Sequence, residues 1–423
     1  MSAPDRQSSF GIFQALRIRQ HLVVMAIAFA AFALQAWLFQ HRLDAPVPPI
    51  LTDFNDYHVV GRMVAAGRAI ETYDWPTLKL EQIVQTRNWS FMPWAYPPPF
   101  TMLVGLLGLL PIWAAYLLFM AVTWLLFYAA MVRLAGRATI PALFVILPSL
   151  IINGKGGQAG FLSAAFIGWF LVFLRERSAK AGWPLGAMIF KPHLAAGIGL
   201  LALIERRWGA MVRAVVLIAA SFAVATLVLG VEIWPAFQKG TSTASEYLWT
   251  GFYPLERMLT VFAALHRFGV PAVAAMVVHL TCAAALVLAV ALAWWRKART
   301  ETVFALTVCV CLMTSPYTYD YDGVALGLAY AMVLPRFVAR AGRYELPIAV
   351  LLSWIATSNY LWSGLRQYWY GVPIITHEMQ LWTISPIALA ALGALVIVVL
   401  RRPARPDAPW LRAYSWMAGR KPG

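Results

Sequence analysis

The sequence predicts an all-α protein that crosses a membrane many times. Of its 423 residues, 61% are hydrophobic and only 12% are charged, and the mean hydropathy is +0.68. A soluble domain has about 25% charged and about 45–50% apolar residues, so this chain has more apolar surface than one water-soluble core can bury. Long apolar runs also recur from end to end, which is typical of a polytopic membrane protein and excludes a soluble or a disordered chain.

The first apolar run, 22–39, follows a polar and basic segment, 1–21. At ~1.5 Å per residue the run is long enough to cross the bilayer. It is longer than the hydrophobic region of a signal peptide, and no clear Ala-x-Ala cleavage site follows it. We therefore expect a signal-anchor helix whose N-terminal segment lies in the cytoplasm.

Two polar segments, 41–96 and 231–257, lie among the apolar runs. The first holds acidic residues with aromatic residues between them, and we expect it to be a long outer loop that contains short helices. The other apolar runs are 97–111, 112–132, 140–152, 160–174, 182–204, 208–230, 270–295, 302–314, 321–335, 344–362 and 380–400. Together they predict a single transmembrane domain over 22–400 with about 10–13 transmembrane helices, followed by a basic cytoplasmic tail, 401–423.

Basic residues indicate the orientation of the spans. They cluster between the runs, at Arg133/Arg137, Arg175/Arg177/Lys180, Arg206/Arg207/Arg213, Arg296/Lys297/Arg299, Arg336/Arg340/Arg343 and in the tail. Placing these clusters and the N-terminus in the cytoplasm gives that side 23 Lys+Arg and 6 Asp+Glu, against 11 and 12 on the other side. The positive-inside rule therefore explains the net charge of +16 without a nucleic-acid partner. We expect an integral membrane protein with both termini cytoplasmic.

Two runs do not fit this orientation as simple spans. Both ends of 182–204 face the cytoplasm, so this run must break near Lys191 and Pro192 into a hairpin. Run 97–111 begins with three prolines and must be re-entrant or interfacial. Proline is where helices break, and broken helices at membrane depth usually line a cavity.

The polar clusters that are not basic all fall on the predicted outer side. They are Thr52–Tyr57, Tyr96–Pro99, Asn153–Gln158, Lys191–His193, Glu246–Trp249 and Ser315–Asp322. Polar groups are costly in lipid unless they serve a cavity. We therefore expect the clusters to form one site, whose substrate contacts include Tyr57, Tyr96, Asn153, Gln158 and Tyr319.

Two pairs of carboxylates stand out. Asp53 and Asp56 open a stretch with apolar residues at helical spacing. Asp53 or Thr52 could be simply the N-cap, or Asp53 could be a general base that faces a cavity, with Asp56 orienting or replacing it. Asp320 and Asp322 alternate with tyrosines at the start of a later span, where they belong either to a solvated loop or to the same site.

Lys191 lies many residues from either end of its apolar run. Snorkelling suits a lysine near a helix end, so this position favours binding of an anion, most simply a phosphate, with help from His193 or Arg257. The Asn153–Gln158 turn is either a plain turn or an approach for backbone N–H groups to an anion. It is not a P-loop. The sequence contains no metal-ligand constellation, and we expect a metal-independent site without a cofactor.

In this order, the motifs resemble glycosyltransferase family 87 over about residues 20–400. The resemblance is carried by D-F-x-x-Y at Asp53, Y-P-P at Tyr96, an N-G-x-x-Q-like turn at Asn153, K-P at Lys191 and S-P-Y-x-x-D-Y-D at Ser315. The turn, N-G-K-G-G-Q, is longer than the usual N-G-Q. His193 stands where the family often has Gln, and the last motif replaces a His-containing version.

The resemblance implies a GT-C-like fold in the bacterial inner membrane and the activity of an inverting glycosyltransferase. Such an enzyme moves a sugar, by family mannose, from a polyprenyl-phosphate sugar to a lipid or glycan hydroxyl outside the cytoplasm. The acidic base of GT-C enzymes lies in the first outer loop and matches Asp53, and Tyr57 matches the accompanying tyrosine. Lys191, with Arg257 or His193, would stabilise the leaving phosphate. The residues alone also allow a transporter or flippase for a lipid-linked or anionic solute, although no inverted repeat is visible.

Overall fold

The computed structural model describes residues 6–41, 51–362, 365 and 383–405. Within these ranges all regular elements are helices, and extended backbone pairs only at an isolated antiparallel bridge between Met258 and Tyr319. The predicted all-α class is therefore confirmed. The remaining parts of the predicted first loop and basic tail, 42–50 and 406–423, lie outside the described residues.

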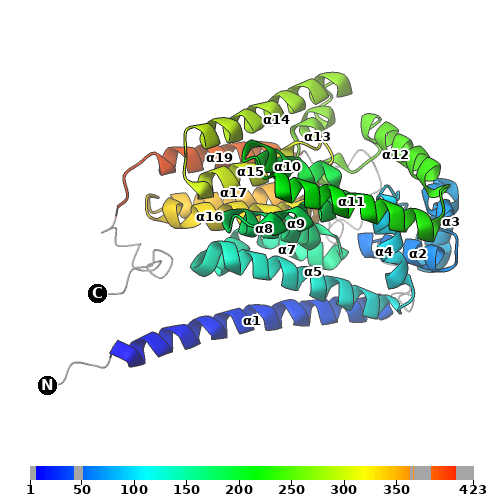
Figure 1. Cartoon of the computed structure of the whole chain (residues 1–423), viewed down its shortest axis with the longest axis horizontal. Coiled ribbons are helices and arrows are strands. Elements are labelled where there is room, and N and C mark those ends of the chain that lie inside the picture. Colours follow the sequence, from blue (N-terminus) through cyan, green and yellow to red (C-terminus); the bar gives the residue numbers. More distant parts are fainter. Residues whose placement is uncertain (1–5, 42–50, 363–364, 366–382, 406–423) are drawn as a thin grey trace.

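Four stretches of helix in the described chain are long and apolar enough to cross a membrane. They lie in α1 (Arg6–Gln40), in α5 (Ile112–Ala135) with its continuation to Val145, in α11 (Trp208–Leu229) and in α14 (Ala272–Trp295). In α1, α11 and α14 only 17%, 11% and 22% of the apolar window is buried, so most of each window is left to face lipid. Figure 1 shows α1 along one edge of the bundle and α14 along the opposite edge.

Other apolar helices are shorter, at 10–17 residues. They are α4 (Pro98–Gly108), α8 (Gly160–Arg175), η6 (Pro192–Ala195) with α10 (Ala196–Ile204), α15 (Thr300–Met313), α17 (Glu345–Thr357) and α19 (Ser385–Leu400). At ~1.5 Å per residue they measure ~15–26 Å, less than a hydrocarbon core of about 30 Å. Non-helical backbone next to these helices can therefore reach membrane depth, where it must be buried in protein or line a cavity.

The break that the charge pattern predicts in 182–204 is confirmed. This run forms α9 (Gly182–Ala187) and η5 (Met188–Phe190), then leaves the helical conformation at Lys191, where φ is −136° and ψ is 70°, before η6 and α10. Proline disfavours helical dihedrals in the residue before it, which explains why the chain breaks there. Run 140–152, expected as one stretch, is instead divided at Ile146 into α6 (Thr139–Val145) and α7 (Leu147–Gly156).

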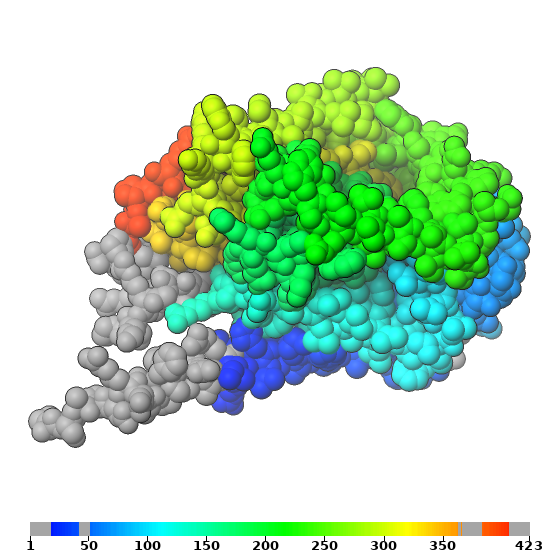
Figure 2. All heavy atoms as spheres, viewed as in Figure 1, coloured from blue at the N-terminus to red at the C-terminus, as the bar shows by residue number. Residues whose placement is uncertain are grey.

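Short helices of the first and second polar segments gather at one end of the bundle, at the right in Figure 1. They are α2 (Asp53–Ala65), η2 (Ile70–Tyr73), α3 (Trp75–Thr86) and α12 (Ile233–Trp249). Helix α2 packs backbone to backbone on α4: a Cβ added at Gly108 would lie 2.1 Å from the carbonyl carbon of Gly61. In Figure 2 the green surface of α11 and α12 crosses one face above the cyan surface of α5.

Helices α5 and α19 end at the opposite end of the bundle, where α1 begins (Figure 1), and basic residues lie at or just after both ends. Arg133 pairs with Glu176 at 2.7 Å, and Arg402 pairs with Glu345 at 2.8 Å. The remaining elements link these ends: η3 (Gly136–Ala138), η4 (Ala179–Ala181), η7 (Leu255–Arg257), α13 (Val261–Arg267), η8 (Asp322–Ala325) and α16 (Leu326–Val338). The basic clusters that the sequence assigns to the cytoplasm thus include pairs that join separate segments.

Candidate active site

Helix α2 begins with the first candidate carboxylate. Thr52 is the N-cap, and Asn55 Oδ1 accepts hydrogen bonds from the Thr52 backbone N–H at 3.1 Å and its hydroxyl at 2.7 Å. Asp53 is therefore the first helical residue and not the cap. The sequence allowed either Asp53 or Thr52 as the N-cap, and the N-cap is Thr52. The Asp53 carboxylate is therefore available for other contacts.

Residues 153–158, which the sequence predicts to be a turn, are helical as far as Gly156, where α7 ends. The turn itself is confined to Gly157 and Gln158, and it lies against α2 and the 315–322 loop. Asn153 Oδ1 accepts from Gly160 N–H at 3.0 Å, at the start of α8. Gly157 has φ +67°, and a Cβ there would approach the Phe54 side chain to 2.5 Å. A Cβ at Gly160 would come within 2.3 Å of the Tyr321 carbonyl oxygen. Glycine is needed at both positions because it alone allows these three segments to come so close.

Three predicted site residues meet beside Asp53. The Tyr57 hydroxyl donates to Gln158 Oε1 at 2.8 Å and lies 2.7 Å from the Tyr96 hydroxyl. Asp53 Oδ2 faces the same turn, 3.4 Å from where a Cβ of Gly156 would be. The sequence clusters at 52–57, 96–99 and 153–158 therefore do come together.

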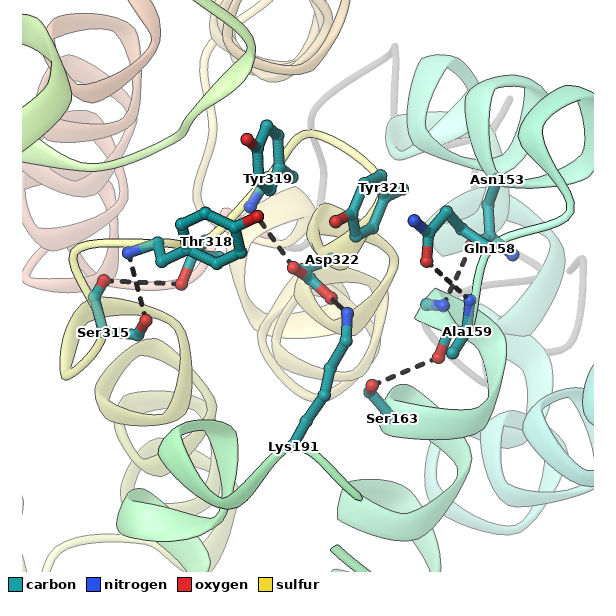
Figure 3. A network of polar contacts seen from close by, with 12 residues as sticks. Asn153, Gln158, Ala159, Ser163, Lys191, Ser315, Thr318, Tyr319, Tyr321 and Asp322 are labelled. Atoms are coloured by element: carbon teal, nitrogen blue, oxygen red, sulfur yellow. Dashed lines mark hydrogen bonds and ion pairs between the residues drawn. The ribbon is translucent and has the colours of Figure 1, made fainter. Parts of the chain in front are cut away.

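Lys191 extends from the helix break toward the 315–322 loop (Figure 3). Its ammonium nitrogen lies 2.8 Å from Asp322 Oδ1, and the two side chains are only 6% and 1% exposed. It also lies 4.8 Å from the centre of the Tyr321 ring. A lysine this deeply buried does not snorkel to water, and the cation is held by a carboxylate and an aromatic face.

Arg257 forms a second pair of the same kind. Its Nη2 and Nε lie 3.1 Å and 3.3 Å from the two carboxylate oxygens of Asp320, a two-point geometry that fixes the guanidinium plane. The backbone joins the same segments, because Asp320 N–H donates to the Arg257 carbonyl at 2.9 Å. Asp320 is 1% exposed and Asp322 is 2% exposed, which excludes the alternative of a solvated loop.

Charges from both pairs act on Asp53. Burial raises the pKa of the Asp53 carboxyl, and this rise is opposed by the positive charge of Arg257, by a hydrogen bond from the Gln158 side chain and by Lys191. Burial also raises the pKa of Asp320, against the attraction of Arg257. A carboxylate with a raised pKa takes up a proton more readily at neutral pH, as a general base must.

The family model for glycosyltransferase family 87 matches residues 94–316, more than half of the chain. The chain belongs to glycosyltransferase family 87. It is therefore a membrane glycosyltransferase, and not the transporter or flippase that the residues alone also allowed. No curated protein and no solved structure matches it. The matched segment includes Tyr96, Lys191 and Arg257, whereas Asp53 precedes it and Asp320 follows it.

Two residues that the sequence predicts to be in the site of this family 87 enzyme, Asp56 and His193, lie apart from the groups around Asp53. Asp56 turns toward α3, where its Oδ1 accepts from Gln82 Nε2 at 2.7 Å. Burial raises its pKa well above the usual range. His193 is half-buried just past the break, and its backbone carbonyl accepts from the Thr314 hydroxyl at 3.1 Å. Neither residue joins the hydrogen-bonded groups beside Asp53.

Three residues beside the ion pairs were given no role by the sequence analysis: Lys155, Tyr321 and Tyr360. The Lys155 ammonium lies 5.2 Å from the centre of the Tyr360 ring, and the Arg257 guanidinium carbon lies 4.5 Å from the same centre. A lysine within a glycine-rich outer turn was a usable signal for Lys155. The described residues contain no group of three His, Cys, Asp or Glu side chains that could hold a metal ion.

Proposed function

We propose that this family 87 enzyme transfers mannose from polyprenyl-phosphate mannose to a hydroxyl group of a lipid or glycan. The observation that carries the proposal is the convergence of two cations, the buried Lys191 and the largely buried Arg257, on the surroundings of Asp53. Two cations suit the phosphate of a lipid-linked donor. A neighbouring carboxylate suits the proton of an acceptor hydroxyl.

The proposed reaction is a single displacement at the anomeric carbon. Asp53 accepts the proton of the acceptor hydroxyl while the acceptor oxygen bonds to the anomeric carbon. The bond from that carbon to the phosphate oxygen breaks, and its electron pair leaves with polyprenyl phosphate. Lys191 and Arg257 stabilise the charge that develops on the phosphate. The transition state is oxocarbenium-like, as in glycosidases, and attack from the opposite face inverts the configuration.

We also propose that the site opens on the non-cytoplasmic side of the bacterial inner membrane. The positive-inside rule supports this, because basic pairs such as Arg133–Glu176 and Arg402–Glu345 lie at the end away from α2 and α3. Nucleotide sugars are confined to the cytoplasm, so an outward site favours a lipid-linked donor. Lys191 and Arg257 supply the charge that a metal would otherwise provide, and we expect the reaction to need none.

The test measures transfer from labelled polyprenyl-phosphate mannose to endogenous acceptors in washed membranes, with and without EDTA. We expect wild-type transfer to survive EDTA and Asp53→Asn to lower it by about 100-fold or more, the usual size of a lost general base. Full activity in Asp53→Asn would contradict the assignment of the base. No transfer by folded wild-type protein would contradict the donor, and a panel of other lipid-linked sugars would follow.

A further inference from the structure

Two buried glutamines lie beside the two carboxylates at the start of α2, one beside each. Gln82 is 0% exposed and donates to Asp56. Gln158 is 4% exposed, and its hydrogen bond is one of the groups that act on Asp53. Buried side-chain amides need partners for both their oxygen and their nitrogen. The two glutamines therefore provide a matched pair of contacts, one for each candidate base.

The orientation of the Gln158 amide is determined by its neighbours. The backbone N–H of Ala159 lies 3.1 Å from Oε1, and a backbone N–H can only donate, so the atom that faces it must be oxygen. The Tyr57 hydroxyl donates to the same oxygen at 2.8 Å. With the oxygen occupied by donors, only the NH₂ group is left to act on Asp53. The two side chains lie side by side, because a Cβ at Gly156 would be 3.4 Å from Asp53 Oδ2 and 3.9 Å from Gln158 Cγ.

The donor and the acceptor of each hydrogen bond between Tyr96, Tyr57 and Gln158 can consequently be assigned. Tyr57 has a single hydroxyl proton, which it gives to Gln158, so the Tyr96 hydroxyl donates to Tyr57 across 2.7 Å. Asp53 and Tyr57 are one helical turn apart and share a face of α2. Gln158 thus contacts this face from the turn that follows α7.

We propose that Gln158 is a positioning residue for Asp53, and that it holds the carboxylate ready to receive a proton before the acceptor binds. Tyr57 and Tyr96 fix the Gln158 amide in the orientation that this requires. The inference rests on the proposed role of Asp53 as the base. It gives three residues that the sequence assigns to substrate binding a role toward the base instead.

Several titratable and charged groups act on Asp53 from the elements around it, and a pH profile reports their sum. They are Asp56 and Tyr57 of α2, Tyr96, Lys191, Arg257 of η7, and Tyr319, Asp320 and Tyr321 of the 315–322 loop. Gln158 is uncharged at every pH, so replacing it leaves the charges of these groups in place.

The first experiment compares pH profiles of kcat/KM for wild type and Gln158→Leu in membranes. Leucine keeps the volume of glutamine but cannot donate a hydrogen bond. The ionised form of Asp53 then loses a stabilising contact, so its pKa rises and the acid limb moves to higher pH by about 0.5–1 unit. We expect kcat to fall by about 10-fold and KM for the donor to change by less than about 2-fold, because the proposal assigns Gln158 to the base and not to the donor.

Gln82→Leu is the matched control, because it makes the same chemical change beside Asp56. We expect it to leave the acid limb where it is in wild type. Tyr57→Phe removes only the hydroxyl that orients Gln158 and preserves the packing of the ring. We expect it to move the acid limb in the same direction as Gln158→Leu, by a smaller amount.

An acid limb that stays in place in a folded, active Gln158→Leu enzyme would overturn the proposal. So would a shift caused by Gln82→Leu and not by Gln158→Leu, which would transfer the positioning role to Asp56. If Gln158→Leu fails to fold, Tyr57→Phe decides between the same outcomes. Failure of the proposed function is a separate result, because wild type itself would then transfer no mannose.

Discussion

At the scale of single residues, the Lys191–Asp322 pair joins positions 131 residues apart. Its two side chains are almost completely buried. If one partner were removed, water could not solvate the charge that remained. Removing one member of such a pair leaves an uncompensated charge, which costs about 3–5 kcal/mol, whereas removing both charges is often neutral. The pair can therefore be tested for stability and for catalysis separately.

We expect Lys191→Met to lower thermal stability and to abolish transfer. Lys191→Met combined with Asp322→Asn should regain most of the stability, because no buried charge is left unpaired, but should stay inactive because the cation for the phosphate is missing. Melting temperatures of the detergent-purified proteins and transfer rates in membranes measure the two effects. A double variant that transfers mannose at the wild-type rate would exclude Lys191 from phosphate binding.

Asp56 provides a pH-dependent test at the same scale. Burial raises its pKa in the folded protein above the unfolded value of about 3.9. The protonated form is therefore favoured by folding, and its contribution to stability is complete below about pH 4 and is lost as the pH rises through the folded pKa. We expect Asp56→Asn to be at least as stable as wild type at pH 7, with no advantage near pH 4.

Melting temperatures across this pH range measure the effect. The variant keeps the hydrogen bond from Gln82, because asparagine also carries an acceptor oxygen. An Asp56→Asn protein that is much less stable than wild type at pH 7 would contradict the expectation. Its transfer rate, compared with that of Asp53→Asn, separates the two candidate bases.

At the scale of elements, α4 supports the helix that carries Asp53. A Cβ at Gly108 would lie 2.1 Å from the carbonyl carbon of Gly61 and 2.4 Å from the nitrogen of Arg62. Both contacts are with backbone, which no change of rotamer can relieve. The spacing of α2 and α4 therefore depends on glycine at this position.

We expect Gly108→Ala to destabilise the protein by about 1–3 kcal/mol, as overpacking does, and to reduce transfer because α2 must move. Gly393→Ala in α19 is the matched control, since a Cβ there meets nothing within 4 Å. The control should be neutral or up to about 1 kcal/mol more stable, because alanine favours helix. Equal melting temperatures for both variants would contradict the close α2–α4 contact.

Much of the helical layout could be predicted from the sequence. The charge count placed a break at Lys191 and Pro192, because both ends of 182–204 carry basic clusters. The division of 140–152 at Ile146 was missed, because hydropathy is similar on its two sides. The pairing of Arg257 with Asp320 and of Asp56 with Gln82 was also out of reach, since spacing along the chain does not say which segments meet. The resemblance, not the spacing, singled out Asp53 as the base.

At the scale of the whole molecule, the separation of basic and acidic clusters predicts how the chain sits in the membrane. We expect a membrane-impermeant maleimide to label Lys239→Cys in intact cells and to label Arg296→Cys only after the cells are broken. Both positions are exposed, Lys239 on α12 and Arg296 at the end of α14. A protein that retains only its native cysteines, Cys282, Cys309 and Cys311, is the background control. The reverse labelling pattern would invert the proposed orientation.

The two ion pairs also bear on how quickly the enzyme can turn over. A phosphodiester donor carries one negative charge, whereas the monoester left behind carries about 1.5–2 at pH 7. Cations without carboxylate partners would therefore bind the product, polyprenyl phosphate, more tightly than the sugar-bearing donor, and product release would be slow. Asp320 and Asp322 pair with Arg257 and Lys191. In the proposed reaction these carboxylates would compete with the departing phosphate for the two cations. The carboxylates would thus shorten the residence time of polyprenyl phosphate in the site. After it leaves, they would neutralise the two cations until the next donor binds.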